Sequence, residues 1–382
     1  MPHRSFSMRG NAKKGKEMKR TLIAFGFLSA ISFGSALATE TKVEGRIYGS
    51  WWMYLTDSVF VSNGDYVDHK GWSQFSLDRS YMTMKSMLTD YTSVNLTTDL
   101  NTKGGFSGYD VILKYGYAAV KMPFWTPLVF SLGLQPTKYP EFVDNQVWGH
   151  RYLEKNIGDR LELLTTSDLG ATLDYAIGQE GKNGSAGVSL WNGTKYSDVS
   201  EKNKNKDLNL YAGLRPLADN ADFSNSAVGA QVYLGTQNEV IDTSLASGDF
   251  KRQIISVAGK VNYRDYFDFG LDYWSNTLGQ VNSLGNSIDD LKQNAFMVYG
   301  VFYFKNVVSE TSLLRTLDLL LRYDMFDPNT DTENNKENLL IAGFECAPAK
   351  GINASLNYRS YSFEAGDKDS QNYIYLNTEF KF

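Results

Sequence analysis

The last eleven residues, Asn372 to Phe382, read NYIYLNTEFKF. Ile374, Leu376 and Phe380 fall on one face of an extended chain, and polar or tyrosine side chains fall on the other. This period-2 alternation predicts a β-strand with two different environments. A terminal strand that leaves its outer edge unpaired invites unwanted pairing. Closure onto the first strand as a barrel removes that edge, although an edge strand of a soluble sandwich would show the same alternation.

The same alternation recurs along most of the chain. Longer, polar connections alternate with short ones. In a barrel, this pattern places long loops at one end and short turns at the other. An even number of strands places both chain ends at the short-turn end. The sixteen predicted strands are Lys42–Leu55, Trp72–Lys85, Tyr91–Leu100, Gly108–Met122, Leu128–Pro136, Leu161–Gln179, Ala186–Asn192, Asp207–Pro216, Ser226–Gln237, Lys251–Arg264, Phe267–Thr277, Asn294–Asn306, Leu314–Phe326, Asn338–Pro348, Ile352–Glu364 and Asp369–Phe382.

The charged residues of these strands share one face. In Leu314–Phe326, for example, Asp318, Arg322 and Asp324 alternate with leucines. In a soluble barrel the apolar faces would point inward and would have to fill an interior that is too large for side chains once the strands number sixteen. In a bilayer the apolar faces would instead point outward to lipid, and the charged faces would point inward to a water-filled lumen. The predicted fold class is therefore all-β, a transmembrane antiparallel barrel of about 16 strands with short periplasmic turns and long extracellular loops.

The N-terminus has the pattern of an export signal. Basic residues precede the apolar run Thr21–Leu37. The run ends in the triplet Ala36-Leu37-Ala38, which has the small-x-small pattern of a cleavage site. We therefore predict an N-terminal extension and cleaved signal peptide over residues 1–38 and a single β-barrel domain over residues 39–382. The chain has 38 Lys and Arg against 43 Asp and Glu. Removal of seven basic residues and one acid with the signal would leave 31 against 42, a net charge of −11, which argues against a nucleic-acid partner.

Few residues offer catalytic chemistry. Outside the signal the chain has two histidines, His69 and His150, and one cysteine, Cys346. No nucleophile elbow, zinc-protease motif or phosphate-binding loop is present. The sequence therefore predicts no enzyme, no cofactor and no metal site.

Several motifs, taken in order, resemble the outer-membrane porins, and more closely the phosphate-selective porin O and P-like family. Each motif is weak alone, but together they cover most of the chain after the signal. They are the first strand GRIYGSW, Phe75-x-Leu77-x-Arg79-x-Tyr81, Gly133-Leu-Gln-Pro-Thr137, Trp148-Gly-His-Arg-Tyr-Leu-Glu-Lys155, Asn192-Gly193, Arg322-Tyr-Asp324 and the terminal Phe382.

The resemblance implies a homotrimer of 16-stranded barrels whose third long loop, Thr137–Asp159, folds into the lumen and narrows it. It also implies that Phe382 is an assembly signal read by the outer-membrane assembly machinery. The resemblance does not extend to phosphate selectivity. That selectivity needs an uninterrupted series of Lys and Arg along the lumen, and in this sequence acidic residues alternate with the lumen bases. We predict a passive channel for small hydrophilic solutes and ions. Its constriction would hold Glu141, Arg151, Glu154, Lys155 and Arg160, and its wall would hold Arg79, Asp99, Arg322, Asp324 and Arg359.

Two other functions stay open at this point. In a solute-specific channel, for a sugar or for an anion such as phosphate, the loop aromatics would form a stacking surface; these are Tyr139, Phe142, Trp148 and Tyr152. An outer-membrane enzyme or adhesin would conduct no ions. The acidic balance predicts at most a mild preference for cations.

Overall fold

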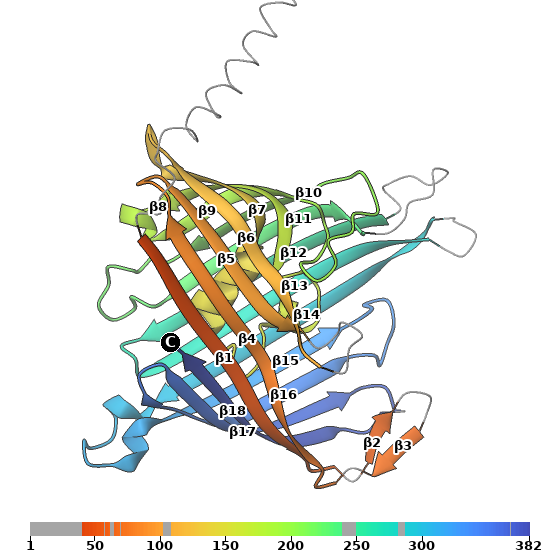
Figure 1. Cartoon of the computed structure of the whole chain (residues 1–382). Helices are drawn as coiled ribbons and strands as arrows, with labels where there is room; N and C mark the ends of the chain where they lie inside the picture. Colours follow the sequence, from red (N-terminus) through yellow and green to blue (C-terminus); the bar gives the residue numbers. More distant parts are fainter. Residues whose placement is uncertain are drawn as a thin grey trace, which may run out of the picture.

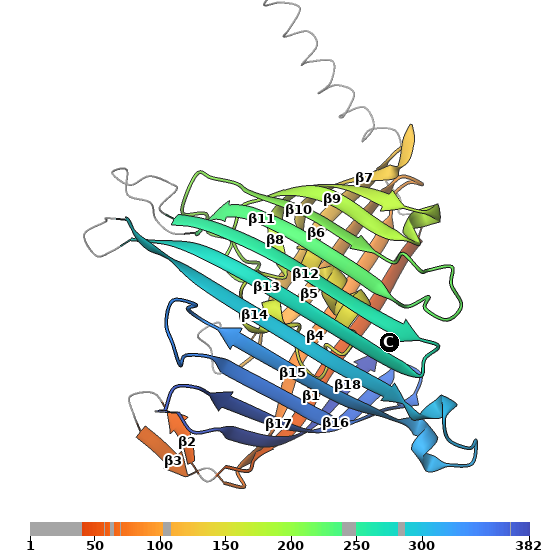
Figure 2. The same cartoon turned by 180° about the vertical axis from the view of Figure 1, so that it is seen from behind.

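The computed structural model describes residues 40–382 except 57, 62–64, 69, 102–107, 239–249, 282–286 and 367. The predicted signal peptide and His69 lie outside this part of the chain. Among the described residues, sixteen antiparallel strands form one closed barrel (Figures 1 and 2). They are β1 (Glu40–Tyr54), β4 (Ser73–Met87), β5 (Thr92–Asn101), β6 (Asp110–Met122), β7 (Trp125–Pro136), β8 (Ser167–Ile177), β9 (Gly184–Trp191), β10 (Asp207–Leu214), β11 (Ala227–Thr236), β12 (Lys251–Tyr263), β13 (Phe267–Val281), β14 (Ser287–Tyr303), β15 (Leu317–Asp327), β16 (Glu337–Ala349), β17 (Ile352–Phe363) and β18 (Gln371–Lys381).

The first strand closes the barrel by pairing with the last. β1 pairs with β4 on one side and with β18 on the other, in a register that places Trp51 opposite Leu376 and Trp52 opposite Tyr375. Figure 1 shows β1 and β18 side by side although they are the two ends of the sequence. The expected closure of the terminal strand onto the first is thus confirmed, and neither strand keeps an open edge.

The connections alternate in length as predicted, with two exceptions. Residues 215–226 and 304–316 lengthen the short-turn end, where the second contains the 3-10 turns η4 (Phe304–Asn306) and η5 (Leu313–Thr316). A third short turn, η2 (Gln179–Gly181), joins β8 to β9. The first long loop, between the predicted strands Lys42–Leu55 and Trp72–Lys85, contains a hairpin that the prediction did not include, β2 (Ser58–Val61) paired with β3 (Asp65–Asp68). These additions leave the barrel and its strand order unchanged.

The wall is apolar outside and polar inside. Leu321, Leu356 and Phe269 are half exposed or more on the outer surface, whereas Arg322 and Asp272 are fully buried inside. On β18, Leu376 and Phe380 face outward while the side chains of Asn377 and Glu379 face inward and are buried. This inversion is the arrangement expected of a barrel surrounded by lipid.

The third long connection does not extend away from the barrel. Residues 137–166 form α2 (Lys138–Phe142), η1 (Val143–Trp148) and α3 (Ile157–Arg160) and pack inside the lumen, where Figure 2 shows the short helical turns behind the strands of the wall. The prediction that Leu161–Gln179 is one strand is wrong in its first six residues, because Leu163 and Leu164 pack into this interior cluster. In the described part of the chain, no helix is long and apolar enough to cross a membrane.

Candidate functional site

The inserted loop, residues 137–166, lies against one side of the lumen, and glycines in the wall and in the loop make the close approach possible. Gly213 and Gly229 are register partners on β10 and β11. A Cβ on either would stand 2.4 or 2.5 Å from the ring of Phe142. The two glycines therefore form a shallow recess that holds this ring. Gly158 of the loop likewise packs directly against the indole of Trp274 on β13.

Arginines of the wall bind the backbone of the loop. Arg322 on β15 donates from Nη1 to the carbonyl of Lys155 (2.8 Å). Arg359 on β17 donates from Nη2 to the carbonyl of Leu153 (2.6 Å). These carbonyls belong to an irregular segment that has no ladder of its own, so the side chains satisfy backbone groups that would otherwise be buried without partners. The charged donors make these bonds stronger than neutral ones.

Arg322 and Asp324 were predicted to line the pore wall, and this expectation needs correction. Both lie on the inner face of β15 but are completely buried, because the inserted loop covers them. Arg322 forms a two-pronged ion pair with Asp324, with N–O distances of 2.8 and 2.7 Å. Arg160 of the loop donates to the same carboxylate at 3.0 Å. Arg160 therefore anchors the loop to the wall, and this buried cluster does not face open water.

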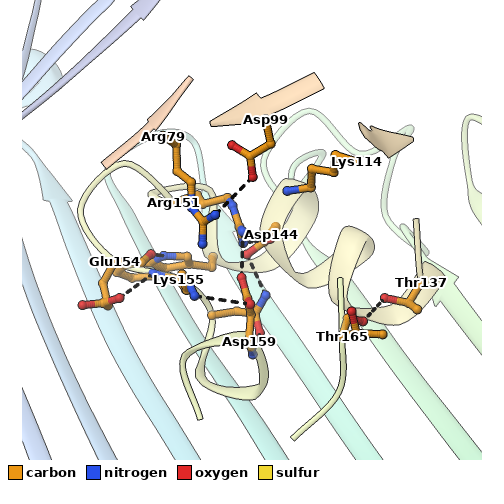
Figure 3. Close-up of polar contacts among 12 residues, drawn as sticks. Arg79, Asp99, Lys114, Thr137, Asp144, Arg151, Glu154, Lys155, Asp159 and Thr165 are labelled. Carbon is orange, nitrogen blue, oxygen red and sulfur yellow. Dashed lines mark hydrogen bonds and ion pairs between the residues drawn. The ribbon is translucent and has the colours of Figure 1, made fainter. Parts of the chain in front are cut away.

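Arg151 is the electrostatic centre of the loop. Its guanidinium bonds to Asp144, and its Nη2 donates to Asp159 at 2.7 Å (Figure 3). Asn156 donates to Asp144 at 2.7 Å and accepts the backbone N–H of Asp159 as the cap of α3. Burial alone would raise the pKa of Asp159, but Arg151, with Lys155 and Lys114, lowers it to about 2. The loop therefore holds its shape through internal charge pairs.

The other side of the lumen stays open and contains two cavities. The inner cavity, about 720 Å³, lies toward the short-turn end, where it is bordered by Glu44, Lys350 and Phe382. The outer cavity, about 630 Å³, lies toward the long loops and is bordered by Trp52 and Gln74. Tyr48 and Arg151 border both cavities, and we call the region around these two residues, which separates the cavities, the neck.

Charged groups surround this neck. Arg79 borders the outer cavity and donates to Asp99 at 3.1 Å, while Asp99 itself is buried behind it. Lys114 borders the inner cavity, and Figure 3 shows its ammonium group beside Asp99 and Arg151. In the described part of the chain no carboxylate lies within 4 Å of Lys114; its Nζ donates to the Tyr81 hydroxyl (3.0 Å) and lies 4.3 Å from that ring. Alternation alone did not single out Lys114, because the register of β5 and β6 shifts between Thr97 and Thr98 and leaves Lys114 as the extra residue of β6.

The remaining predicted site residues divide between the two cavities. Glu141 borders the inner cavity, whereas Glu154, Lys155 and Arg359 border the outer one. Arg359 pairs with Glu154 at 3.0 Å. Of the ten predicted charged residues, six therefore border open space: Glu141, Arg151, Glu154, Lys155, Arg79 and Arg359.

The aromatic residues of the loop serve as anchors, which contradicts their expected role as a stacking surface. Tyr139 and Trp148 are 1% exposed, so neither ring is accessible to a solute. The Tyr139 hydroxyl donates to Asp272 at 2.9 Å, and the Trp148 indole donates to the Glu154 carbonyl at 2.7 Å. Phe142 occupies the glycine recess described above.

His150 joins the loop to β16. Its Nδ1 lies 2.9 Å from Oε1 of Glu345, and the Tyr152 hydroxyl donates to the same oxygen at 2.6 Å. Burial disfavours the imidazolium ion, but the charge and hydrogen bond of Glu345 outweigh burial and raise the pKa of His150 above its usual range. The described residues contain no group of three His, Cys, Asp or Glu side chains that could hold a metal ion. His150 is therefore another anchor of the loop.

The comparisons with known proteins establish the fold. No protein-family model and no curated protein matches the sequence. The outer membrane channel DcaP of Acinetobacter baumannii matches with a TM-score of 0.63 at 15% identity, over 92% of this chain and 99% of that one. The trimer form of OmpT, an outer membrane protein of Vibrio cholerae, gives a TM-score of 0.56 at 13% identity, over 90% and 99%.

An anion-selective porin from Comamonas acidovorans gives a TM-score of 0.55 at 10% identity, over 90% of this chain and 99% of that one. All three likenesses span nearly the whole of the solved chain. The molecule therefore has the fold of the porins, a closed 16-stranded antiparallel barrel.

Proposed function

We propose that the protein is a passive diffusion channel for small hydrophilic solutes and ions. One observation carries the proposal: two cavities bordered by charged and polar side chains share Tyr48 and Arg151 in their linings, inside a closed barrel whose outer surface is apolar. A wet lumen lets a solute cross without losing its hydration, and the inserted loop limits the size of what passes.

The location that fits this channel is a Gram-negative outer membrane, with lipid against the apolar outer surface. Its short turns would face the periplasm and its long loops the exterior. Export would require removal of residues 1–38, which leaves residues 39–382 as the barrel domain. The motifs that resemble the phosphate-selective porin O and P-like family support this location, and we infer kinship with that family without its phosphate selectivity.

Within this channel, the six charged residues that border the cavities would set ion preference, and the buried set around Arg322 would hold the loop. Some bases of the lining have acidic partners that lie behind them: Asp99 behind Arg79, for example, is 1% exposed. Other acidic partners border the cavities themselves, but the two cavities together are bordered by nine Lys and Arg against five Asp and Glu. This arrangement revises the expected mild cation preference, and we propose a weak preference for anions.

Assembly of the channel would follow the porin pattern. A homotrimer is supported by the trimer form of OmpT, which shares the fold. Phe382 would act as the signal for the outer-membrane assembly machinery, because it directly follows the closing strand β18 and is 73% exposed. Its backbone also bonds with Gly45 in both directions, at 2.8 and 3.1 Å.

Single-channel recording in a planar bilayer tests the function. The gene product should be expressed from the full sequence, so that the signal peptide can be removed, and purified from membranes. Its insertion into the bilayer should raise the conductance in groups of three equal steps. An outer-membrane enzyme or adhesin would produce no such steps, and their absence from protein shown by circular dichroism to be folded would refute the proposal. Equal single steps without grouping would refute the trimer alone.

A further inference from the structure

An aromatic platform lines the outer half of the lumen at the seam between the first and last strands. We define it as Trp52, Tyr54, Tyr373 and Tyr375. Trp52 is the register partner of Tyr375, and Tyr54 is the partner of Tyr373. The ring centroids of the Trp52–Tyr375 pair are 6.5 Å apart with planes tilted by 33°, and those of Tyr54–Tyr373 are 4.7 Å apart. Trp52 and Tyr375 also border the outer cavity, so the platform meets open space.

A β-bulge adds a carboxylate beside this platform. Along β1 and β4 the register passes from Tyr48 opposite Arg79 to Gly49 opposite Leu77, which leaves Asp78 as an extra residue. A bulge changes the direction of the side chains next to it. Here both Asp78 and Arg79 border the outer cavity. Within the described residues, no Lys or Arg nitrogen lies within 4 Å of the Asp78 carboxylate, and Asp78 is exposed.

The other polar groups around the cavity are neutral or already paired. Gln74 and Asn377 contribute carboxamides, and Ser50 and Ser76 contribute hydroxyls. Among the bases, Arg79 pairs with Asp99 and Arg359 with Glu154; Arg151 and Lys155 both pair with Asp159. The cavity thus combines flat aromatic faces, hydrogen-bonding groups and one carboxylate, Asp78, that accepts a hydrogen bond from Ser50 but forms no close ion pair in the described chain.

This combination selects against charged ligands. Asp78 repels anions. Its attraction for cations is offset by the nearby charges of Arg359 and Arg79, and the guanidinium of Arg359 already covers one face of Tyr375 at 3.9 Å. A neutral saccharide fits both sets of groups: its C–H faces pack on aromatic rings, and its hydroxyls donate to a carboxylate and exchange bonds with carboxamides. A volume of about 630 Å³ also falls within the usual range of about 300–1,000 Å³ for small-ligand sites.

We propose that the outer cavity is a binding subsite for neutral saccharides, with Trp52 and Tyr375 as stacking surfaces and Asp78 as the hydroxyl acceptor. The subsite deepens the proposed channel function and rests on it for its role in transport. Conduction requires a site that binds weakly enough to release its solute. A saccharide would therefore pause above the neck before it passes Tyr48 and Arg151.

Current block by maltose tests the subsite in the reconstituted, trimer-forming protein. Maltose should interrupt the current with saturable kinetics at concentrations at which a polyethylene glycol of matched hydrodynamic size only lowers conductance in proportion to its amount. Trp52→Leu and Tyr375→Leu should each weaken maltose block about 3- to 10-fold, because each removes one flat stacking surface. Asp78→Asn, which preserves packing, should weaken it to a similar degree.

Trp51→Leu is the matched control, because Trp51 is the next residue on β1 and lies on the opposite face, where it pairs with Leu376 and Phe75. Its maltose block should equal that of the unchanged protein. The subsite is refuted if maltose acts only as the matched polymer does, if Trp51→Leu and Trp52→Leu behave alike, or if choline blocks at lower concentration than maltose. If no conductance appears at all, the channel proposal fails, and quenching of tryptophan fluorescence by maltose in detergent still tests the subsite.

Discussion

Gly158 of the inserted loop lies so close to Trp274 of β13 that a Cβ added to Gly158 would stand 2.2 Å from Cζ2 of the indole. The loop can approach this wall only because position 158 has no side chain. Gly158→Ala should weaken loop docking by about 1–3 kcal/mol, the usual cost of overpacking. Single-channel recording should then show larger or fluctuating conductance. Gly366→Ala, whose Cβ would meet no atom within 4 Å, should conduct normally; equal behaviour of the two variants would contradict the docking role.

The buried cluster of Arg322, Asp324 and Arg160 should dominate the stability of the loop. Asp324→Leu would leave two guanidinium groups without their carboxylate inside the barrel, a loss of about 3–5 kcal/mol. Urea unfolding in detergent should show this loss as a lower midpoint. The pair variant Arg322→Met with Asp324→Leu should recover much of the stability, because it removes both fully buried charges and leaves only Arg160, whose side chain is 17% exposed, without the carboxylate. A pair no more stable than Asp324→Leu alone would refute this explanation.

His150 should make loop docking depend on pH. Because Glu345 raises the pKa of His150 in the folded protein, the charged pair stabilises the docked loop fully below the unfolded pKa of about 6.5 and is lost as pH rises through the higher folded pKa. Hydrogen exchange of the loop amides, corrected for intrinsic rates, should therefore rise more between pH 6 and pH 9 than exchange in the strands. His150→Gln should remove this excess. The same excess in His150→Gln would exclude His150 as its source.

Lys114 should contribute to the weak anion preference, since it borders the inner cavity and has no carboxylate within 4 Å in the described chain, although it is only 4% exposed. Lys114→Met should move the reversal potential in a KCl gradient toward cation selectivity. The shift should shrink at high salt, because the screening length falls from about 10 Å at 0.1 M to about 3 Å at 1 M. Lys195→Met is the control, because Lys195 is an exposed loop residue paired with Glu162. A strong cation preference of the unchanged protein would refute the proposal.

Phe382 and Gly45 should act together in barrel closure. A Cβ on Gly45 would stand 2.1 Å from the ring of Phe382, so the ring lies directly over this glycine. Gly45→Val should displace the ring and impair outer-membrane insertion, as should removal of Phe382. Heat-modifiable migration on gels of membrane fractions would report the folded fraction. Normal insertion of both variants would show that the terminal ring is dispensable. Gly108→Ala, in open space, should insert normally.

The strands were predictable because alternation reports which side of the wall each residue faces. One motif nevertheless misled: Phe75, Leu77, Arg79 and Tyr81 share one face by strict alternation. In the structure Phe75 is 82% exposed outside, whereas Arg79 borders the lumen, because the bulge at Asp78 shifts the phase between Leu77 and Arg79. The only sign of this shift in the sequence was the charge of Arg79, which follows Phe75 and Leu77 on a face that is otherwise apolar.

The site was less predictable than the wall, because its contacts join residues that are far apart in the chain. Glu154 meets Arg359 across 205 positions, and Tyr152 meets Glu345 across 193. Alternation placed Arg322 and Asp324 on the inner face correctly, but it contains no information on the loop that covers them. The loop aromatics were misread for the same reason: a ring that anchors a loop and a ring that stacks on a solute look alike in sequence.

The seam between β1 and β18 has a consequence for the order in which the molecule is completed. The first strand to leave the translocation machinery waits for the last, so the cylinder cannot close before the whole chain has been delivered, and such long-range pairing is slow. Trp52 and Tyr54 meet Tyr375 and Tyr373 only at that moment. The proposed saccharide subsite thus exists only in finished barrels, and a sugar that binds it would favour the closed state by mass action.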